Sequence, residues 1–222
     1  MADPCRIVVF ASGNGSNFQA LIDAQIPNSN IVRLIVNKKQ AYATTRADKA
    51  GIPWEYFNLI SHGFQAKGEK DPQKIQEARD KYDAALAEKL LKGDYRPDLV
   101  VLAGWMYVFG KSFLDPLDAA GIRIINLHPA LPGKYDGANA IDRAFADFQE
   151  GKLENGRTGI MVHYVIDKVD RGEPILVREI ECREGETLDQ LKERIHGHEH
   201  QLIVEATTKV VREIVARKSK TQ

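Results

Sequence analysis

Short apolar runs alternate with segments of helical periodicity over the first two thirds of the chain. The apolar runs predict buried strands at residues 6–11, 31–37, 54–58, 99–103 and 122–127. Helical periodicity between them predicts helices at residues 18–24, 42–50 and 72–91, the last with Asp71 as N-cap and Pro72 in its first turn. This alternation is typical of an α/β fold, a parallel sheet covered by helices on both faces.

The last third of the chain follows a different pattern. A helix is predicted at residues 138–150, followed by strands at 158–165 and 174–181 that a turn at 170–173 connects. These strands are expected to extend the sheet to about seven strands, with one antiparallel strand near the C-terminal end. Thr187 and Gln190 fit a capping box that opens a helix to about residue 216, and residues 218–222 are expected to form a frayed polar tail.

Composition narrows the class of protein. The chain has 222 residues, of which 31 are basic and 31 acidic, so the formal net charge is zero, and 43% of the residues are hydrophobic. This length and apolar content suit one large domain. A zero net charge gives no support for nucleic acid as a partner. Cys5 and Cys182 form no metal or redox motif, and no signal-peptide or membrane-helix pattern is present, so we expect a cytoplasmic protein with small-molecule partners.

Polar side chains close the fifth apolar run, in Asn126-Leu127-His128-Pro129. Residues two apart on a strand point to the same side, so Asn126 and His128 are expected to project together at the carboxyl end of the sheet. An amide and an imidazole there form a donor pair suited to an oxyanion. Asp170, in a later strand-and-turn segment, supplies a carboxylate that can orient the imidazole or relay a proton. The alternative is that His128 only caps the end of a strand.

The loop Ser12-Gly13-Asn14-Gly15-Ser16-Asn17 joins the first predicted strand to the first predicted helix. Its glycines allow a ligand to approach the backbone, and the free N–H groups and dipole of the following helix attract an anion. The loop lacks the lysine of a Walker loop and the third glycine of the dinucleotide fingerprint, so a phosphate monoester fits best. The alternative is a tight turn without a ligand.

These motifs, together with Ala103-Gly104-Trp105-Met106 and the segment from Val162 through Asp170, occur in the order and spacing of the phosphoribosylglycinamide formyltransferases. The chain resembles this family from Arg6 to about Val211, and its segment 127–133 resembles fungal members most. The resemblance implies a Rossmann-like sheet and a single domain over residues 1–222. A phosphate-binding half would extend to about residue 110, and a catalytic and folate-binding half would cover about residues 111–217.

The resemblance also implies a reaction. A formyl group passes from N10-formyltetrahydrofolate, the co-substrate, to the amine of glycinamide ribonucleotide in purine synthesis, through a tetrahedral intermediate and without a metal. By position, the catalytic residues are Asn126, His128 and Asp170. The ribonucleotide-binding residues are Gly13, Asn14, Gly15, Ser16, Asn17 and Glu199. The folate-binding residues are Arg79, Met106, Tyr107, Val108, Phe109, Val165, Ile166 and Asp167.

Some of these assignments have open alternatives. Without the resemblance, we would interpret Glu199 and Arg79 as solvent-exposed residues on helices. His163 also matches a family position, but the alternative is a strand histidine whose hydrogen bonds are satisfied. Tyr107 stands where bacterial relatives often carry arginine, which is expected to alter contacts to the folate tail. We expect neither nucleic acid nor membrane as a partner, and a monomer or a homodimer.

Two other functions compete with the transferase. A formyltetrahydrofolate hydrolase shares the Asn, His and Asp residues but usually carries an extra N-terminal regulatory domain, whereas this chain begins at its first predicted strand. A non-catalytic phosphosugar-binding protein can adopt a similar sheet, because fold alone does not fix function. Consumption of formyl folate with and without glycinamide ribonucleotide distinguishes the three functions.

Overall fold

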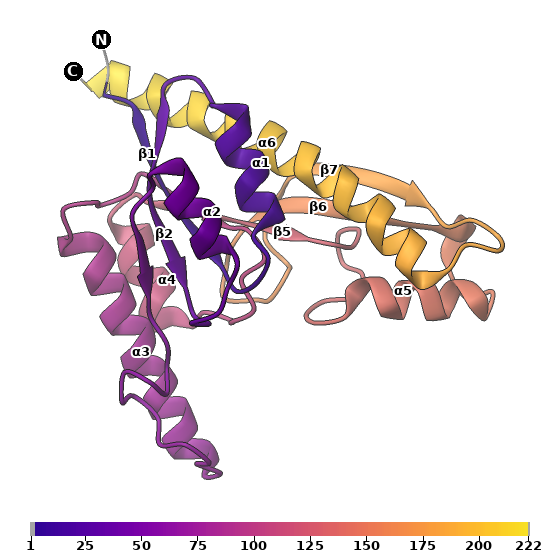
Figure 1. Cartoon of the computed structure of the whole chain (residues 1–222), viewed down its shortest axis with the longest axis horizontal. Coiled ribbons are helices and arrows are strands. Elements are labelled where there is room, and N and C mark those ends of the chain that lie inside the picture. Colours follow the sequence, from indigo (N-terminus) through magenta and orange to yellow (C-terminus); the bar gives the residue numbers. More distant parts are fainter. Residues whose placement is uncertain (1–2, 222) are drawn as a thin grey trace.

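The computed structural model describes residues 3–221 and is built around a seven-stranded sheet with helices on both faces (Figure 1). Met1, Ala2 and Gln222, which belong to the predicted domain, lie outside the described residues. The strands are β1 (Cys5–Ala11), β2 (Ser29–Val36), β3 (Trp54–Tyr56), β4 (Leu99–Leu102), β5 (Arg123–His128), β6 (Arg157–Tyr164) and β7 (Pro174–Glu181). The helices are α1 (Ser16–Ala24), α2 (Ala43–Ala50), α3 (Pro72–Lys92), α4 (Lys111–Ala119), α5 (Ala140–Gln149) and α6 (Leu188–Thr221), with a 3-10 turn η1 at Glu154–Gly156.

The strands lie in the order β3-β2-β1-β4-β5-β6-β7. β1 to β5 are parallel, β6 is antiparallel to β5, and β7 is antiparallel to β6, so β6 alone is reversed in the sheet of residues 3–221. This confirms the predicted mostly parallel sheet with one antiparallel strand. The chain runs from β1 through β2 to β3 on one side of β1 and then crosses back to β4 on its other side, and such a switch point is where sheets of this kind bind ligands.

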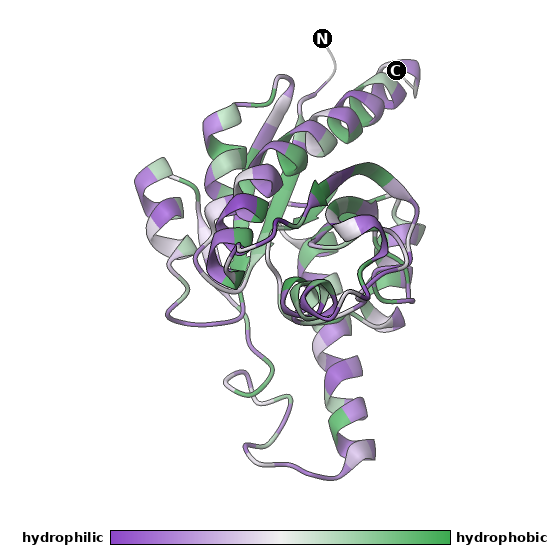
Figure 2. Ribbon diagram, turned by 90° about the vertical axis from the view of Figure 1, so that its right-hand side faces the viewer, coloured by the Kyte–Doolittle hydropathy of each residue, from purple (hydrophilic) through white to green (hydrophobic). Residues whose placement is uncertain are grey.

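Two apolar layers sandwich the sheet. Side chains of α1, α2, α5 and α6 pack on one face, and those of α3 and α4, including the fully buried Tyr82 and Phe113, pack on the other. Figure 2 shows hydrophobic colouring on the central strands and hydrophilic colouring on the outer faces of the helices. The central strands β1 and β4 are buried on both sides, which explains why they read as continuous apolar runs and not as alternating ones.

The ends of two helices follow the predicted capping patterns. The Asp71 side chain accepts a hydrogen bond from the Gln73 N–H at 2.9 Å at the start of α3, with Pro72 as the first helical residue. Thr187 and Gln190 form the predicted capping box before α6, with their side chains bonded to each other's backbone N–H groups at 2.8 and 3.3 Å. Local sequence therefore determines both helix starts.

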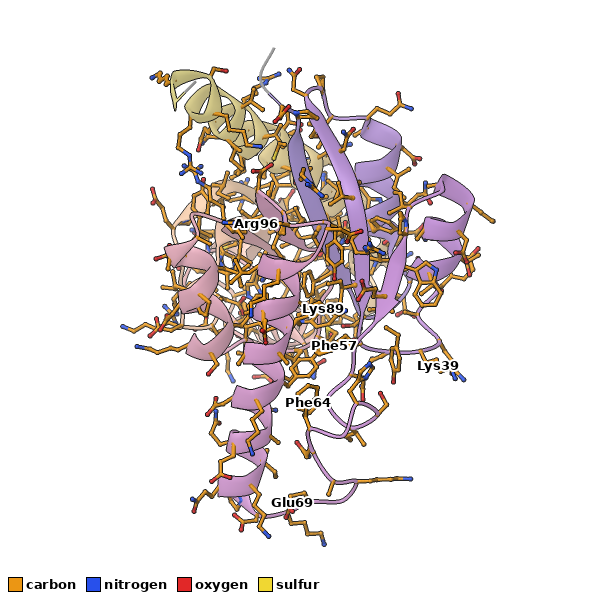
Figure 3. All side chains as sticks on the ribbon, turned by 90° about the vertical axis from the view of Figure 1, so that its left-hand side faces the viewer. Lys39, Phe57, Phe64, Glu69, Lys89 and Arg96 are labelled. Carbon is orange, nitrogen blue, oxygen red and sulfur yellow. The ribbon has the colours of Figure 1, made fainter. Side chains whose placement is uncertain are left out.

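The start of α3 and the loop before it extend beyond the sheet (Figure 3). Phe57 and Phe64, labelled there, pack their rings against Tyr82 of α3 at centroid distances of 5.0 and 5.6 Å. These aromatic contacts hold the loop against the helix. They also place Tyr82 in the same cluster as Tyr107, 5.1 Å away, at the edge of the site described below.

One helix is missing from the sequence prediction. α4 contains Pro116 and begins after Gly110, which has no side chain to cap it. Proline inside a helix and an N-terminus without a serine, threonine, aspartate or asparagine cap are both typical of loops. Because Gly110 and Pro116 are typical of loops, the sequence did not predict a helix in this segment.

The chain beyond β6 differs from the prediction in two places. β6 ends at Tyr164, so the connection to β7 covers residues 165–173 and is longer than the predicted turn at 170–173. The predicted frayed tail is wrong as far as Thr221, because α6 continues to that residue. The Lys218 ammonium lies 2.6 Å from Asp98 Oδ2 and ties the last turns of α6 to the start of β4. Among residues 3–221, neither α6 nor another helix has the length and hydropathy needed to cross a bilayer.

Candidate active site

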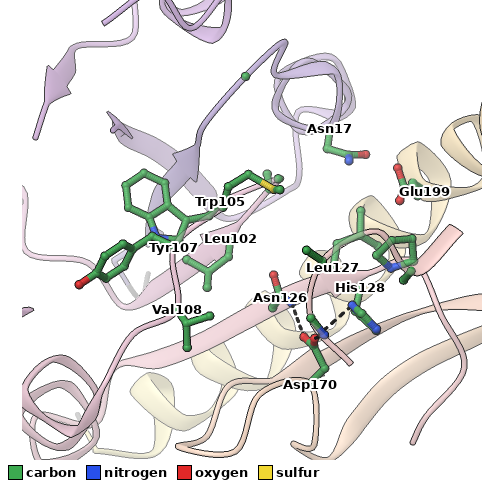
Figure 4. A pocket seen from close by; sticks show the side chains of 18 of the residues that line it. Asn17, Leu102, Trp105, Tyr107, Val108, Asn126, Leu127, His128, Asp170 and Glu199 are labelled. Atoms are coloured by element: carbon green, nitrogen blue, oxygen red, sulfur yellow. Dashed lines mark hydrogen bonds and ion pairs between the residues drawn. The ribbon is translucent and has the colours of Figure 1, made fainter. Parts of the chain in front are cut away.

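A cavity of about 490 Å³ opens at the carboxyl ends of β1, β4 and β5, at the switch point of the sheet. Its lining comes from the glycine loop after β1, the segment after β4, the end of β5, the 165–170 loop and one turn of α6. Figure 4 shows side chains from these separate parts of the chain converging on it. The sheet therefore places the two motifs singled out in the sequence on opposite walls of one cavity.

Asp170 joins the polar side chains at the base of the cavity (Figure 4). Its Oδ2 lies 3.3 Å from Nδ1 of His128 and accepts a hydrogen bond from the Gly137 N–H at 2.8 Å, and its Oδ1 accepts one from Asn126 Nδ2 at 3.3 Å. Asp170 has φ of 53°, in the left-handed region, and is 9% exposed. Aspartate is one of the few side chains that tolerate this backbone conformation.

His163 adds a fourth polar group. Its Nδ1 lies 2.8 Å from the Tyr164 carbonyl oxygen, which can only accept, so Nδ1 carries a proton. In a neutral ring the other nitrogen, Nε2, then accepts from Asn126 Nδ2 at 3.2 Å. The β5–β6 pairing sets this contact, because Asn126 and His163 are directly opposed in the antiparallel register. Both hydrogens of the Asn126 amide therefore face Asp170 and His163.

The pKa values of the two central groups favour a neutral imidazole beside an ionised carboxylate. Burial lowers the pKa of His128 below its usual value, and the opposing effect of Asp170 does not offset it. Burial alone would raise the pKa of Asp170, but the nearby His163, whose Nε2 lies 3.4 Å from Oδ1, the hydrogen bond from the Gly137 N–H and the nearby His128 lower it. With its Nδ1–H toward Asp170, the neutral ring of His128 leaves Nε2, which is buried without a hydrogen-bond partner, as a proton acceptor.

The glycine loop forms the opposite wall. Gly15 has φ of 74°, and a Cβ there would lie 2.7 Å from Ala43 Cβ, so this position requires glycine. Arg46 of α2 braces the loop by donating to the carbonyl oxygen and the side-chain oxygen of Asn14, at 2.9 and 2.8 Å. α1 begins at Ser16, so the N–H groups of its first turn lie at the loop for which the sequence predicts an anion site. Within the described chain, no lysine or arginine lines the cavity.

Glu199 is a buried carboxylate in the same cavity. It is 7% exposed, and burial raises its pKa to about 7, with a smaller lowering effect from the Asn17 side chain. Figure 4 shows Glu199 beside Asn17, across the cavity from His128 and Asp170. His196, one turn earlier on α6, also lines the cavity; it is exposed, yet partial desolvation and the nearby His200 lower its pKa. A carboxylate this buried without a cationic partner is costly unless a ligand supplies one.

The segment after β4, residues 104–110, forms the third wall, and we refer to it as the strap. Met106 and Val108 are 68% and 55% exposed, whereas Trp105 and Phe109 are buried. Exposed and buried side chains alternate in this way when an extended backbone packs one of its two sides against the core. The strap is held at its start by Ser12, whose side-chain oxygen accepts from the Met106 N–H at 2.9 Å and whose N–H donates to the Gly104 carbonyl at 3.0 Å.

The structure brings together nearly all of the residues predicted for the site. Arg79 and Asp167 are the two that do not line the cavity: the Arg79 guanidinium lies over the Tyr107 ring, 5.6 Å from its centroid, and Asp167 is exposed in the 165–173 loop. His196 and Ser12 were missed. The spacing of His196 three residues before Glu199, on one helix face, is a signal that could have identified it. Ser12 acts through its hydroxyl on a backbone 94 residues away, which sequence does not reveal.

The chain is similar in sequence to proteins of one family. A family model described as formyl transferase matches residues 5–207. The phosphoribosylglycinamide formyltransferase of Schizosaccharomyces pombe is 43% identical over 210 residues, covering 92% of this chain and 96% of the relative, and that of Saccharomyces cerevisiae is 42% identical over 220 residues, covering 94% and 98%. Both are fungal, as the sequence resemblance suggested.

A solved structure agrees with these sequence matches. The glycinamide ribonucleotide transformylase 1 of Symbiobacterium toebii superposes with a TM-score of 0.78 at 29% identity, covering 96% of this chain and 90% of that one. In residues 3–221, no group of three or more histidine, cysteine, aspartate or glutamate side chains is arranged to hold a metal ion.

Proposed function

We infer the function from the family: this chain belongs to the formyl transferase family, whose model matches residues 5–207. The chain transfers a formyl group to glycinamide ribonucleotide in purine biosynthesis, as its relatives are named for doing. We propose N10-formyltetrahydrofolate as the donor and a reaction that needs no metal. The observation that carries the proposal is Asp170, which joins His128 and Asn126 at the base of a cavity whose far wall is the glycine loop.

The reaction forms one C–N bond and breaks another. The amine of the ribonucleotide attacks the formyl carbon, and the carbonyl π electrons move to oxygen to give a tetrahedral oxyanion. When the oxyanion collapses, the bond from carbon to N10 of the folate breaks, and a proton from the attacking amine ends on N10. Catalysis therefore needs a group that accepts and returns a proton and a donor for the oxyanion.

His128 and Asp170 fit the proton transfer. Neutral His128 presents Nε2 as the acceptor of the amine proton, and the resulting imidazolium is stabilised by the ionised Asp170 at 3.3 Å from Nδ1. The imidazolium then donates to the oxyanion or to the leaving nitrogen. To donate to the oxyanion, the Asn126 amide must break its hydrogen bond to either Asp170 or His163. The bond to Asp170, at 3.3 Å, is longer than the bond to His163, at 3.2 Å.

The ribonucleotide lies between the glycine loop and the catalytic residues. Its phosphate accepts hydrogen bonds from the N–H groups of residues 13–17. Glu199, near Asn17, accepts from the ribose and amine end. His196 is placed to donate to the phosphate as an imidazolium, which a bound dianion would favour. This wall contains no other side chain, among those described, that could carry positive charge.

The folate lies against the strap and the 165–170 loop. Met106, Val108 and Ile166 are exposed apolar side chains that line the cavity, and a flat heterocycle would cover them. Tyr107, Phe109 and Val165, which are less exposed, also line this wall. Neither Arg79 nor Asp167 lines the cavity. We therefore propose that they contact the outer end of the folate.

The wider assignments are proposals of the same kind. We propose a single formyltransferase domain, with the phosphate-binding half ending near residue 110 and the catalytic and folate-binding half following it to about residue 217. We also propose a cytoplasmic protein that acts as a monomer or a homodimer and has no nucleic-acid or membrane partner. Size measurements in solution test the oligomeric state.

An absorbance assay of folate product tests the reaction. Purified protein is mixed with N10-formyltetrahydrofolate, with and without glycinamide ribonucleotide. We expect product only when the ribonucleotide is present. Product without the ribonucleotide would point to a hydrolase, and no product in either mixture would leave a phosphosugar-binding protein.

Replacing Glu199 by glutamine should weaken ribonucleotide binding and remove its pH dependence near pH 7. The pKa of Glu199 is raised to about 7, so the ionised acceptor forms as the pH rises through that value. The wild-type KM for the ribonucleotide should therefore fall between pH 6 and pH 8, whereas the variant should have a KM about tenfold higher and independent of pH in this range. Glu193→Gln, an exposed change on the same helix, is the control.

The same substitution should stabilise the protein at alkaline pH. A carboxyl group whose pKa is higher in the folded state than its usual 4.5 binds more protons when folded, so stability falls as the pH rises from about 4.5 to 7. Glutamine avoids burying that charge, and we expect Glu199→Gln to raise the free energy of unfolding at pH 8 by about 2 kcal/mol. Urea unfolding at pH 5 and pH 8 measures this; an equal effect at both pH values would contradict it.

A further inference from the structure

Asp83 is a buried carboxylate that the proposed mechanism does not use. It lies on α3, is 2% exposed, and accepts a hydrogen bond from the Gly110 N–H to Oδ2 at 2.7 Å. Burial raises the pKa of Asp83 to about 6, against the lowering effect of that hydrogen bond. Burying an ionisable carboxyl group costs free energy, so the presence of Asp83 at this position calls for a structural or functional reason.

The contact with Gly110 completes the N-terminus of another helix. Gly110 is the N-cap residue of α4 and offers no side chain to that end. Asp83 supplies the missing carboxylate from α3, next to the positive end of the α4 dipole. A Cβ at Gly110 would lie 3.3 Å from Asp83 Oδ2, so the absence of a side chain at Gly110 keeps the approach open.

Asp83 also lies behind the strap. Oδ1 of Asp83 and the hydroxyl of Tyr107 are both buried without a hydrogen bond of regular geometry, yet the two groups act on each other's pKa. The Tyr107 ring packs against Tyr82, which precedes Asp83 on α3, and against Phe109 at 5.6 Å. Asp83 therefore touches the strap at its last residue and from behind its middle.

The two ends of the strap are thus fixed by two side chains from different elements. Ser12, at the end of β1, holds the Met106 N–H, and Asp83 holds the Gly110 N–H. Between these anchors, Met106 and Val108 face the cavity. The position of the apolar wall relative to the catalytic residues depends on both anchors.

We propose that Asp83 is a positioning residue for the formyl folate: by holding the Gly110 N–H it fixes the strap on which the pterin ring lies. This inference rests on the proposed folate wall. Asp83 touches neither substrate nor reacting atoms. Its loss lets the strap move away from the cavity and weakens folate binding, while the glycine loop, Glu199 and the catalytic residues keep their places.

Steady-state kinetics with each substrate varied in turn tests the proposal. For Asp83→Ala we expect the KM for formyl folate to rise about tenfold, with kcat and the KM for the ribonucleotide within about twofold of wild type. Asp83→Asn keeps an oxygen that can accept from the Gly110 N–H and should recover most of the folate affinity. Glu77→Ala, an exposed carboxylate change on α3, is the control.

A second variant covers the case in which Asp83→Ala does not fold, as judged by circular dichroism. Gly110→Ala has an allowed backbone, with φ of −93°, but its methyl group presses on Asp83 Oδ2. It should also raise the folate KM selectively. An unchanged folate KM in the folded variants, or an equal rise in both KM values, would overturn the positioning role.

Val108→Asp separates this proposal from the one on which it rests. If Val108→Asp raises the folate KM while the Asp83 and Gly110 variants do not, the folate wall stands and the positioning role of Asp83 is overturned. If Val108→Asp also leaves the folate KM unchanged, the folate lies elsewhere and both proposals are overturned. Selective rises in all three variants support both.

Discussion

Replacing His128 by alanine should lower kcat by about 10³-fold, while both KM values change little. His128 is 3% exposed, and its Nε2, which is buried without a hydrogen-bond partner, is the proton acceptor that we propose. Alanine removes both the acceptor of the amine proton and the imidazolium that donates afterwards. The absorbance assay for folate product, run with both substrates saturating, measures the loss.

His62→Ala is the matched control for this experiment, because it removes an exposed histidine from the loop before α3. It should leave kcat unchanged. Thermal unfolding of both variants establishes that each is folded. A folded His128→Ala enzyme with kcat within about threefold of wild type would contradict the assignment of His128 to proton transfer.

Replacing Asp170 by asparagine should lower kcat by about 10²-fold. Asparagine tolerates the left-handed backbone at this position and offers an oxygen to the Gly137 N–H, so the substitution removes mainly the charge. Without the carboxylate, the pKa of His128 falls further, because Asp170 is the largest influence that raises it. The imidazolium formed during transfer is then less stable.

Asp189→Asn tests whether this effect is specific, since Asp189 is exposed in the first turn of α6 and does not line the cavity. It should leave kcat close to that of wild type. The pH dependence provides a second check: the rate of the wild-type enzyme should fall as the pH drops and His128 becomes protonated before substrate binds. An Asp170→Asn enzyme as fast as wild type would show that the carboxylate has no part in proton transfer.

The parts of the site that lie on regular elements could be predicted from sequence. Asn126 and His128 end an apolar strand, so their common direction follows from the two-residue repeat of a strand. Gly13 and Gly15 follow another apolar strand, and parallel strands bring their carboxyl ends to one edge. Glu199 was assigned by the family resemblance alone, because its burial depends on how α6 packs.

The orientation of the Asn126 amide could not be predicted. It depends on His163, which faces Asn126 only because β6 runs antiparallel to β5 in one particular register. A one-residue shift of that register would place a different side chain there. The sequence predicted a donor for the oxyanion, and the structure shows both of its hydrogens already directed to Asp170 and His163.

The helix ends show the same difference: those set by nearby residues could be predicted, and those set by distant residues could not. The helix starts at Asp71 and Thr187 were predictable because their caps lie within three residues. α4 was missed because its capping group, Asp83, lies 27 residues away on another helix. The end of α6 was placed too early because the partner of Lys218 is Asp98, 120 residues earlier in the chain.

We propose that the glycine loop binds phosphate through backbone N–H groups, and no lysine or arginine of the described chain lines the cavity. The formal net charge of the protein is also zero. We therefore expect the overall charge of the molecule to do little to draw an anionic substrate toward the cavity. Because salt slows association mainly by screening long-range attraction, added salt should change the association rate of the ribonucleotide only slightly. Binding through backbone N–H groups should therefore depend on the shape of the phosphate monoester more than on long-range charge, and it should persist across a wide range of ionic strength.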